Sequence, residues 1–216
     1  LSIQLGVLDR KKKVERLQKA HRHTAPGELR AKFEASLGFA LTPAQQRCVR
    51  EILRDMAAAF PMHRLLQGDV GSGKTVVAAM AALQAVEGGA QAAILAPTEV
   101  LSRQHFIGMC SHLTRMGVEC ALITSDMTPA DRRLALSGLR TGRVQVVVGT
   151  HALLFEQVQF RRLGLVVIDE QHKFGVDQRL ALYGKGEHPD VLVMSATPIP
   201  RTLAMTLYGD LEVSII

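Results

Sequence analysis

From about residue 40 onward the chain alternates between short apolar runs and longer amphipathic runs. Runs that are apolar throughout predict buried strands, and amphipathic runs predict surface helices. Because the two kinds alternate, we predict an α/β fold, a mainly parallel sheet with helices on both faces. The predicted strands are residues 64–66, 91–96, 118–124, 144–148, 165–168 and 191–194, and the predicted helices are 43–58, 74–87, 99–116 and 129–139.

Two local signals support these boundaries. Thr128 offers a helix cap, because Pro129 follows at the first helical position and Asp131 lies three residues on. Gly88 and Gly89 predict the end of the helix at 74–87. Residues 1–20 are predicted helical and 21–27 a break, so we divide the chain into a linker (1–34) and one domain (35–216).

The basic excess is confined to the start of the chain. Residues 1–32 hold nine Lys/Arg against three Asp/Glu, whereas the other 184 residues hold 17 of each sign. This segment is either a solvated linker helix or an arm that contacts phosphates. His21 and His23 are expected to be solvated within it.

Composition excludes several classes of protein. The 216 residues are 47% hydrophobic and 21% charged, which suits a globular domain. No apolar run approaches the length of a membrane span, and no signal peptide is visible. The three cysteines form neither a CxxC pair nor an even set. We therefore expect a cytoplasmic protein with no membrane partner.

The strongest motif is a glycine-rich loop between a predicted strand and a predicted helix. It reads Gly68-Asp69-Val70-Gly71-Ser72-Gly73-Lys74-Thr75, a complete GxxxxGK[ST] pattern. Its glycines allow backbone N–H groups to surround phosphates, and the helix start adds positive charge. Lys74 would reach the β- and γ-phosphates, and the Thr75 hydroxyl would bind Mg²⁺. The loop predicts ATP with Mg²⁺ as cofactors.

Two adjacent acids narrow the chemistry. Asp169 and Glu170 follow the predicted strand at 165–168. A strand-end Asp can hold Mg²⁺, and the adjacent Glu can deprotonate the attacking water. Small-molecule kinases do not need that second acid, so the pair indicates hydrolysis. His105 and His112, by contrast, are interpreted as surface or packing residues.

Polar residues follow three further predicted strands. Ser195 begins the run Ser-Ala-Thr-Pro-Ile-Pro-Arg, Thr98 follows the strand at 91–96, and Thr150 with His151 follows that at 144–148. In a parallel sheet all these loops emerge at the same edge as Gly68 and Asp169. Their hydroxyls and N–H groups suit the phosphates of a polynucleotide.

Five motifs in this order resemble those of superfamily 2 helicases and, more narrowly, of the RecG family of bacterial DNA helicases. They read GDVGSGKT, APTEVLSRQH, VVVGTHALL, VVIDEQHKFGVDQR and SATPIPRTLAMT. The acidic box followed by Lys-Phe-Gly and the long last motif carry the narrower resemblance. It covers the chain from about Phe39 to its last residue and implies a RecA-like motor lobe.

The resemblance implies roles for individual residues. Gln45 would read adenine, as an amide can pair with N6 and N7, and Phe39 would stack on the base. Asp169 would hold Mg²⁺ with Thr75, and Glu170 would be the general base. Coupling of nucleotide state to DNA is assigned to Gln171, His172, Ser195 and Thr197. Contact with the tracked DNA strand is assigned to Thr98, Arg103, Thr150 and His151.

The family's partners are branched DNA, namely forks and Holliday junctions, together with a second RecA-like lobe and a wedge domain. Neither of these domains is found in the 216 residues, so we expect this chain alone to bind Mg–ATP but to hydrolyse it poorly. Alternatives are a lobe of the transcription-repair coupling translocase, which typically has Glu in place of Gln171, and a non-hydrolytic nucleotide-binding module. A P-loop kinase would leave the DNA-facing motifs unexplained.

Overall fold

The computed structural model describes residue 19 and residues 22–169, 184–196 and 211–216. The strands are β1 (His63–Gln67), β2 (Gln91–Leu95), β3 (Cys120–Ile123), β4 (Val146–Gly149), β5 (Leu163–Asp169), β6 (Asp190–Ser195) and β7 (Glu212–Ile215). The helices are α2 (Glu28–Ser36), α3 (Pro43–Ala57), α4 (Lys74–Glu87), α5 (Glu99–His105), α6 (Ser111–Arg115) and α7 (Pro129–Thr141), with a π-helix η1 (Phe106–Cys110) and a 3₁₀-helix η2 (His151–Leu154).

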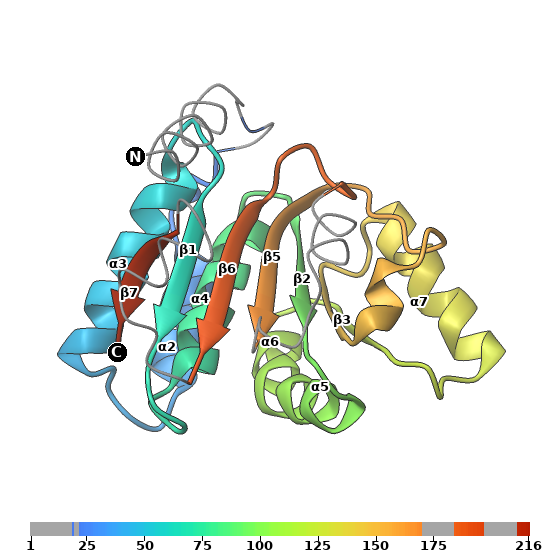
Figure 1. Ribbon diagram of the computed structural model, residues 1–216, viewed down its shortest axis with the longest axis horizontal. Helices are drawn as coiled ribbons and strands as arrows, with labels where there is room; N and C mark the ends of the chain where they lie inside the picture. Colours follow the sequence, from blue (N-terminus) through green and yellow to red (C-terminus); the bar gives the residue numbers. More distant parts are fainter. Residues whose placement is uncertain (1–18, 20–21, 170–183, 197–210) are drawn as a thin grey trace, which may run out of the picture.

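These strands form one sheet in the order β3-β4-β2-β5-β6-β1-β7, and every neighbouring pair is parallel. The arrowheads in Figure 1 therefore point toward one edge. All six strands predicted from the sequence are present, and the predicted α/β fold is confirmed. No helix in the described part of the chain is long and apolar enough to cross a bilayer.

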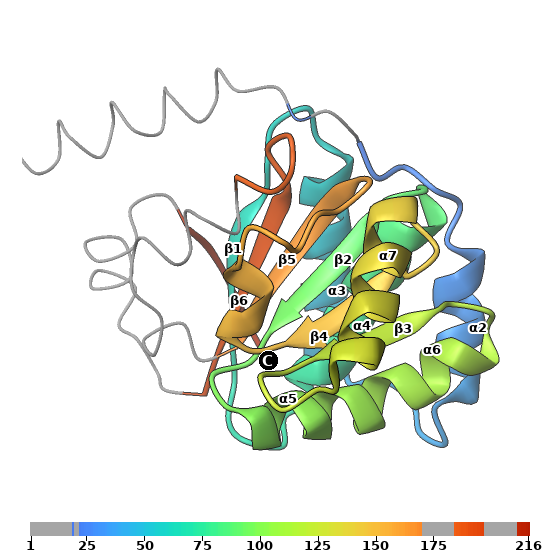
Figure 2. The same cartoon turned by 90° about the vertical axis from the view of Figure 1, so that its right-hand side faces the viewer.

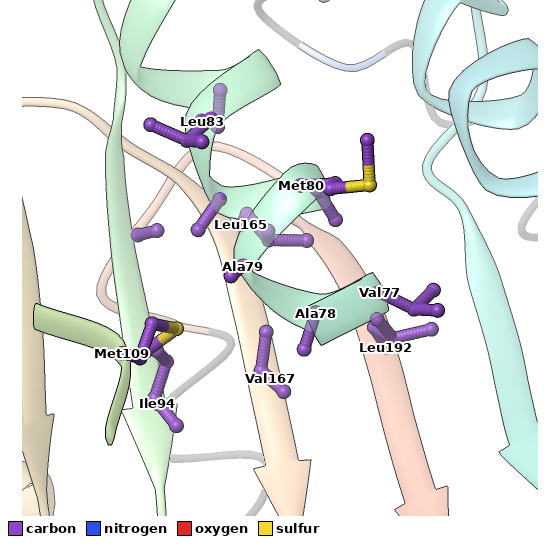
Figure 3. Close-up of a cluster of buried hydrophobic side chains, with 14 of the residues drawn as sticks. Val77, Ala78, Ala79, Met80, Leu83, Ile94, Met109, Leu165, Val167 and Leu192 are labelled. Atoms are coloured by element: carbon purple, nitrogen blue, oxygen red, sulfur yellow. The ribbon is translucent and has the colours of Figure 1, made fainter. Parts of the chain in front are cut away.

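Each face of the sheet carries its own apolar core, because alternate residues of a strand point to opposite faces. Helix α4 packs on one face, where Ala78 and Ala79 lie beside Val167 and Leu165 of β5 (Figure 3). Helix α7 covers part of the other face through Leu139 (Figure 2). Each fully buried Leu or Val contributes about 1.5–3 kcal/mol to folding.

The helix boundaries follow the local signals closely. The Thr128 hydroxyl accepts a hydrogen bond from the Asp131 backbone N–H at 3.2 Å, as the capping pattern predicts. Helix α4 covers the predicted residues, and Gly88 and Gly89 end it, the latter with φ of 76°. The helix predicted at 99–116 is interrupted by the π-helix η1.

Helix α2, strand β7 and the 3₁₀-helix η2 have no counterpart in the sequence prediction. Helix α2 is capped by a distant residue, since Glu87 Oε1 accepts from the backbone N–H groups of Gly27 and Glu28, each at 2.9 Å. Strand β7 reverses the usual pattern, with Ser214 buried and Ile215 exposed. The Ser214 hydroxyl accepts from the buried Arg64 side chain at 2.7 Å. The periodicity of hydrophobic residues predicts neither a helix cap from a distant residue nor a strand whose buried side chain is polar.

A buried ion pair between Lys19, which precedes α2, and Asp190 of β6 connects this part of the chain to the sheet. Lys19 Nζ lies 3.0 Å from both carboxylate oxygens of Asp190, at the start of β6, and donates to Met56 O at 2.6 Å. Burial lowers the pKa of Lys19 and raises the pKa of Asp190 to about 6. Lys19 thus belongs to the protein interior and is not available to a phosphate.

His23 lies beside this pair, and the expectation that it is solvated is wrong. Its side chain is buried, with Nε2 3.5 Å from Asp190 and 3.3 Å from Gly164 O. A Cβ on Gly164 would lie 2.7 Å from the ring, so only glycine permits this approach. His21 lies outside the described residues, and so does the helix predicted at 1–20, apart from Lys19.

We predict that Asp190→Asn lowers the free energy of unfolding by about 3 kcal/mol, because it leaves the Lys19 ammonium buried without a counter-charge. Urea unfolding followed by circular dichroism measures this change. Arg54→Ala is the matched control, since it removes an ion pair with Asp55 in which Arg54 is 73% exposed. The control should change stability by less than about 1 kcal/mol. Equal effects of the two variants would contradict the proposed anchoring.

Candidate functional site

Three neighbouring strands bring the predicted nucleotide motifs together. The glycine-rich loop follows β1, Asp169 ends β5 and Ser195 ends β6, and these strands are adjacent in the order β5-β6-β1. Gln67 is in register with Ser195, and the Gly68 N–H donates to Ser195 O at 3.2 Å. The shared edge that the sequence predicts is therefore present.

The loop at residues 68–75 has the features of a phosphate cradle. Gly73 caps α4 with φ of 88° and makes no side-chain hydrogen bond, so no capping side chain occupies the N-terminus of the helix. Ser72 Oγ is buried and has no hydrogen-bond partner among the described residues. Lys74 Nζ donates to Gly68 O at 2.6 Å and Asp69 O at 2.9 Å, above the same loop. Asp69, Val70 and Gly71 are exposed. The Ser72 hydroxyl, the Lys74 ammonium and the backbone N–H groups at the start of α4 are hydrogen-bond donors that fit the phosphates of a nucleotide.

Gln45 connects the start of α3 to this loop. Its Oε1 accepts from the Thr42 N–H at 2.9 Å, and its Nε2 donates to Ser72 O at 2.8 Å. An amide has two N–H donors and two lone pairs, so one of each remains for a ligand such as adenine. Phe39 lies six residues upstream with 56% of its surface exposed, which leaves its ring accessible for stacking.

Asp169 is paired with a residue that sequence reasoning did not select. His105 Nε2, at the end of α5, lies 2.7 Å from Asp169 Oδ2, and each side chain is 12% exposed. His105 is thus a largely buried residue, as a packing role predicts, but its bond to Asp169 was not predicted. No sequence signal joins the two, because 64 residues separate them and only the fold brings α5 to the end of β5.

The metal-binding predictions fit the donor chemistry. The carboxylate of Asp169 and the hydroxyl of Thr75 supply the oxygen ligands that Mg²⁺ prefers. No cluster of three or more His, Cys, Asp or Glu suited to a metal occurs within the described ranges. Glu170, Gln171, His172 and Thr197 lie outside the described residues.

The predicted DNA contacts lie at the ends of β2 and β4, on the other side of β5. Thr98 caps α5 by accepting from the Leu101 N–H at 3.3 Å. Arg103 is half-exposed and forms an ion pair with Asp126 at 2.5 Å. A hydrogen bond from Thr124 and the Arg103 guanidinium lower the pKa of Asp126. Exposed pairs of this kind contribute little to stability, so Arg103 can exchange Asp126 for another anionic partner at little cost.

Thr150 and His151 differ in accessibility. Thr150 is only 2% exposed, and its hydroxyl has no hydrogen-bond partner in the described structure. His151 is exposed and meets the ring of Phe155 edge-on at 6.2 Å. The guanidinium of Arg132 lies over the Phe155 ring, 5.9 Å from the ring centre. His151 is therefore the more accessible of the two predicted contacts.

The arrangement of these motifs agrees with a family-wide pattern. The pattern of the DEAD/DEAH box helicases matches residues 42–206, which is most of the chain. The chain belongs to the DEAD/DEAH box helicase family. The matched residues include the glycine-rich loop after β1, Asp169 and Ser195.

The narrower resemblance to RecG is also confirmed. The chain is 54% identical to the ATP-dependent DNA helicase RecG of Synechocystis and 51% identical to that of Escherichia coli K12, over 98% and 89% of its length. A solved structure of RecG bound to a three-way DNA junction is 45% identical over 99% of the chain, with a TM-score of 0.88. The chain spans about a quarter of these relatives, 26% and 28% of the two proteins and 29% of the structure.

We predict that Gly73→Ala weakens nucleotide binding by at least about tenfold, because a Cβ there would lie 2.3 Å from Gln45 Nε2 at a positive φ. Titration with a fluorescent ADP analogue measures the dissociation constant. Gly71→Ala is the matched control, since Gly71 also has positive φ but no neighbour within 4 Å of an added Cβ. If both variants bind equally well, the packing of Gln45 on the loop is not what shapes the site.

Proposed function

We propose that this chain is the ATP-binding motor lobe of a longer DNA helicase of the RecG type. The parent protein would couple ATP hydrolysis to branch migration and to regression of stalled forks and Holliday junctions. The observation that carries the proposal is the joining of the nucleotide loop, Asp169 and Ser195 at one edge of the sheet, in a chain 54% identical to RecG. The high identity favours RecG over the transcription-repair coupling translocase.

The nucleotide would lie across the ends of β1, β5 and β6. Backbone N–H groups of residues 71–75 and the Lys74 ammonium would bind the β- and γ-phosphates, while Gln45 and Phe39 would hold adenine. Mg²⁺, when bound by Thr75 and Asp169, would neutralise charge on the phosphates. Glu170 would deprotonate the attacking water, as the general base of the reaction.

DNA would bind at the ends of β2 and β4. Thr98, Arg103 and His151 are exposed there, and Thr98 and Thr150 are the N-cap residues of α5 and η2. Gln171, His172, Ser195 and Thr197 would transmit nucleotide state to this surface. The parent would also contain a second RecA-like lobe and a wedge domain, and we place it in the bacterial cytoplasm. Residues 1–34 would join the lobe, 35–216, to the preceding domain, and α2 crosses this boundary.

ATP turnover by the complete gene product, with and without a three-way DNA junction, tests the proposal. We expect the junction to stimulate turnover. Glu170→Gln should reduce the turnover number by about 10²–10⁴, the usual contribution of general base catalysis, and should retain nucleotide binding. Lys74→Ala should lose both. Turnover that DNA does not stimulate, or that survives in Glu170→Gln, would contradict a DNA-dependent hydrolase with Glu170 as its base. Nucleotide binding without any turnover would favour the non-hydrolytic module.

The isolated 216-residue chain should bind Mg–ATP but hydrolyse it slowly. The reason is that a second lobe would supply an arginine finger, which contributes about 10³–10⁵ to the rate in phosphoryl-transfer enzymes. Comparing turnover of the chain with that of the complete protein, at saturating ATP, measures the difference. Equal turnover numbers would mean that this lobe completes the site without a partner.

A further inference from the structure

We propose that His105 is a positioning residue, which holds the Asp169 carboxylate and thereby joins the DNA-facing helix α5 to the nucleotide site. The inference rests on the proposed function and adds to it a specific path between the two ligands. His105 is the last residue of the motif APTEVLSRQH, and no chemical role was predicted for it from the sequence.

The contact itself is short and sheltered. His105 Nε2 and Asp169 Oδ2 are 2.7 Å apart, and both side chains are 12% exposed. The tautomer of His105 with its proton on Nε2 donates this hydrogen bond, since an ionised carboxylate can only accept. The bond engages one of the two carboxylate oxygens and fixes the orientation of the group. Carboxylates that bind metals are commonly oriented in this way by a second residue.

The fold brings His105 to this position through β2. Strand β2 is the neighbour of β5, with Leu95 in register with Ile168, and α5 begins shortly after β2 ends. Ser102 and Met109 are buried on the same helical run and fix it against the lobe. The π-helix η1 starts directly after His105. Such wide turns often occur at functional sites, where they change the direction of a side chain.

The other end of α5 belongs to the predicted DNA surface. Thr98 caps the helix, and Glu99 Oε1 accepts from the Ser125 N–H at 3.1 Å. Arg103 lies two residues before His105 and pairs with Asp126. The helix is seven residues long, so a DNA strand bound at Thr98 and Arg103 acts on the same rigid element that holds Asp169.

Two consequences follow. Loss of the His105 bond should weaken Mg²⁺ binding, because removing such an orienting partner typically costs about 10–100-fold in metal affinity. It should also weaken the effect of DNA on nucleotide affinity. Linkage requires that DNA and nucleotide affect one another equally, typically by about 5–150-fold.

The test uses the complete gene product and a fluorescent, slowly hydrolysed ATP analogue. Its affinity is measured over a series of Mg²⁺ concentrations, with and without a three-way DNA junction. For His105→Ala we expect the Mg²⁺ concentration at half-maximal binding to rise by about tenfold. We expect DNA to change the nucleotide affinity by less than about twofold, whereas affinity without Mg²⁺ stays within about twofold of the wild type.

Two further variants separate positioning from packing. His105→Gln keeps a side-chain N–H donor and should recover part of both effects. Gln104→Ala alters the exposed neighbour of His105 on the same helix and should behave as the wild type. A merely structural role would instead lower affinity with and without Mg²⁺ alike and would leave the DNA effect intact, which would overturn the inference.

The wild-type protein distinguishes failure of this inference from failure of the proposed function. If the wild type shows coupling and His105→Ala retains it, the positioning role is wrong and the helicase assignment stands. If the wild type binds no nucleotide, both are wrong. If it binds nucleotide with an affinity that DNA does not change, the path through His105 is wrong, and the turnover measurement alone decides the proposed function.

Discussion

The parallel pairing of β5, β6 and β1 is the constraint on which the site depends. Because neighbouring parallel strands end at the same edge, the loop after β1, Asp169 and Ser195 meet there without any direct sequence relation. Strands β2 and β4 continue this edge on the other side of β5, where the predicted DNA contacts lie. Strand β5 thus lies between the nucleotide motifs and the predicted DNA contacts. The His105–Asp169 bond connects α5, on the DNA side, to the end of β5.

Much of this arrangement could be predicted from the sequence, because its signals are local. Runs of Val, Ile and Leu identify the central strands. Thr128 marks the start of α7, and Gly88 and Gly89 mark the end of α4, through interactions with residues next to them in the sequence. The glycine-rich loop also carries its own geometry, since Gly73 needs a positive φ and sits directly at the helix start. The shared edge of these motifs follows from the predicted parallel sheet, whereas the order of the strands comes from the structure alone.

What could not be predicted depends on contacts between distant residues. Glu87 caps α2 from about 60 positions away, and His105 reaches Asp169 across 64. In the sequence Lys19 is one of nine basic residues in a charged segment, whereas in the structure it is buried against Asp190. In each case a polar side chain satisfies a partner that only the fold supplies, so neither periodicity nor spacing reveals the role.

A crystal structure of the complete protein with Mg²⁺ and a non-hydrolysable ATP analogue tests the central claim most directly. The account predicts phosphate oxygens hydrogen-bonded to backbone N–H groups of residues 71–75 and to Lys74, with the ion bound at Thr75 Oγ1 and at Asp169, directly or through a water. It also predicts adenine beside Gln45. Nucleotide bound away from the ends of β1 and β5, or an ion that Asp169 does not help to hold, would contradict it.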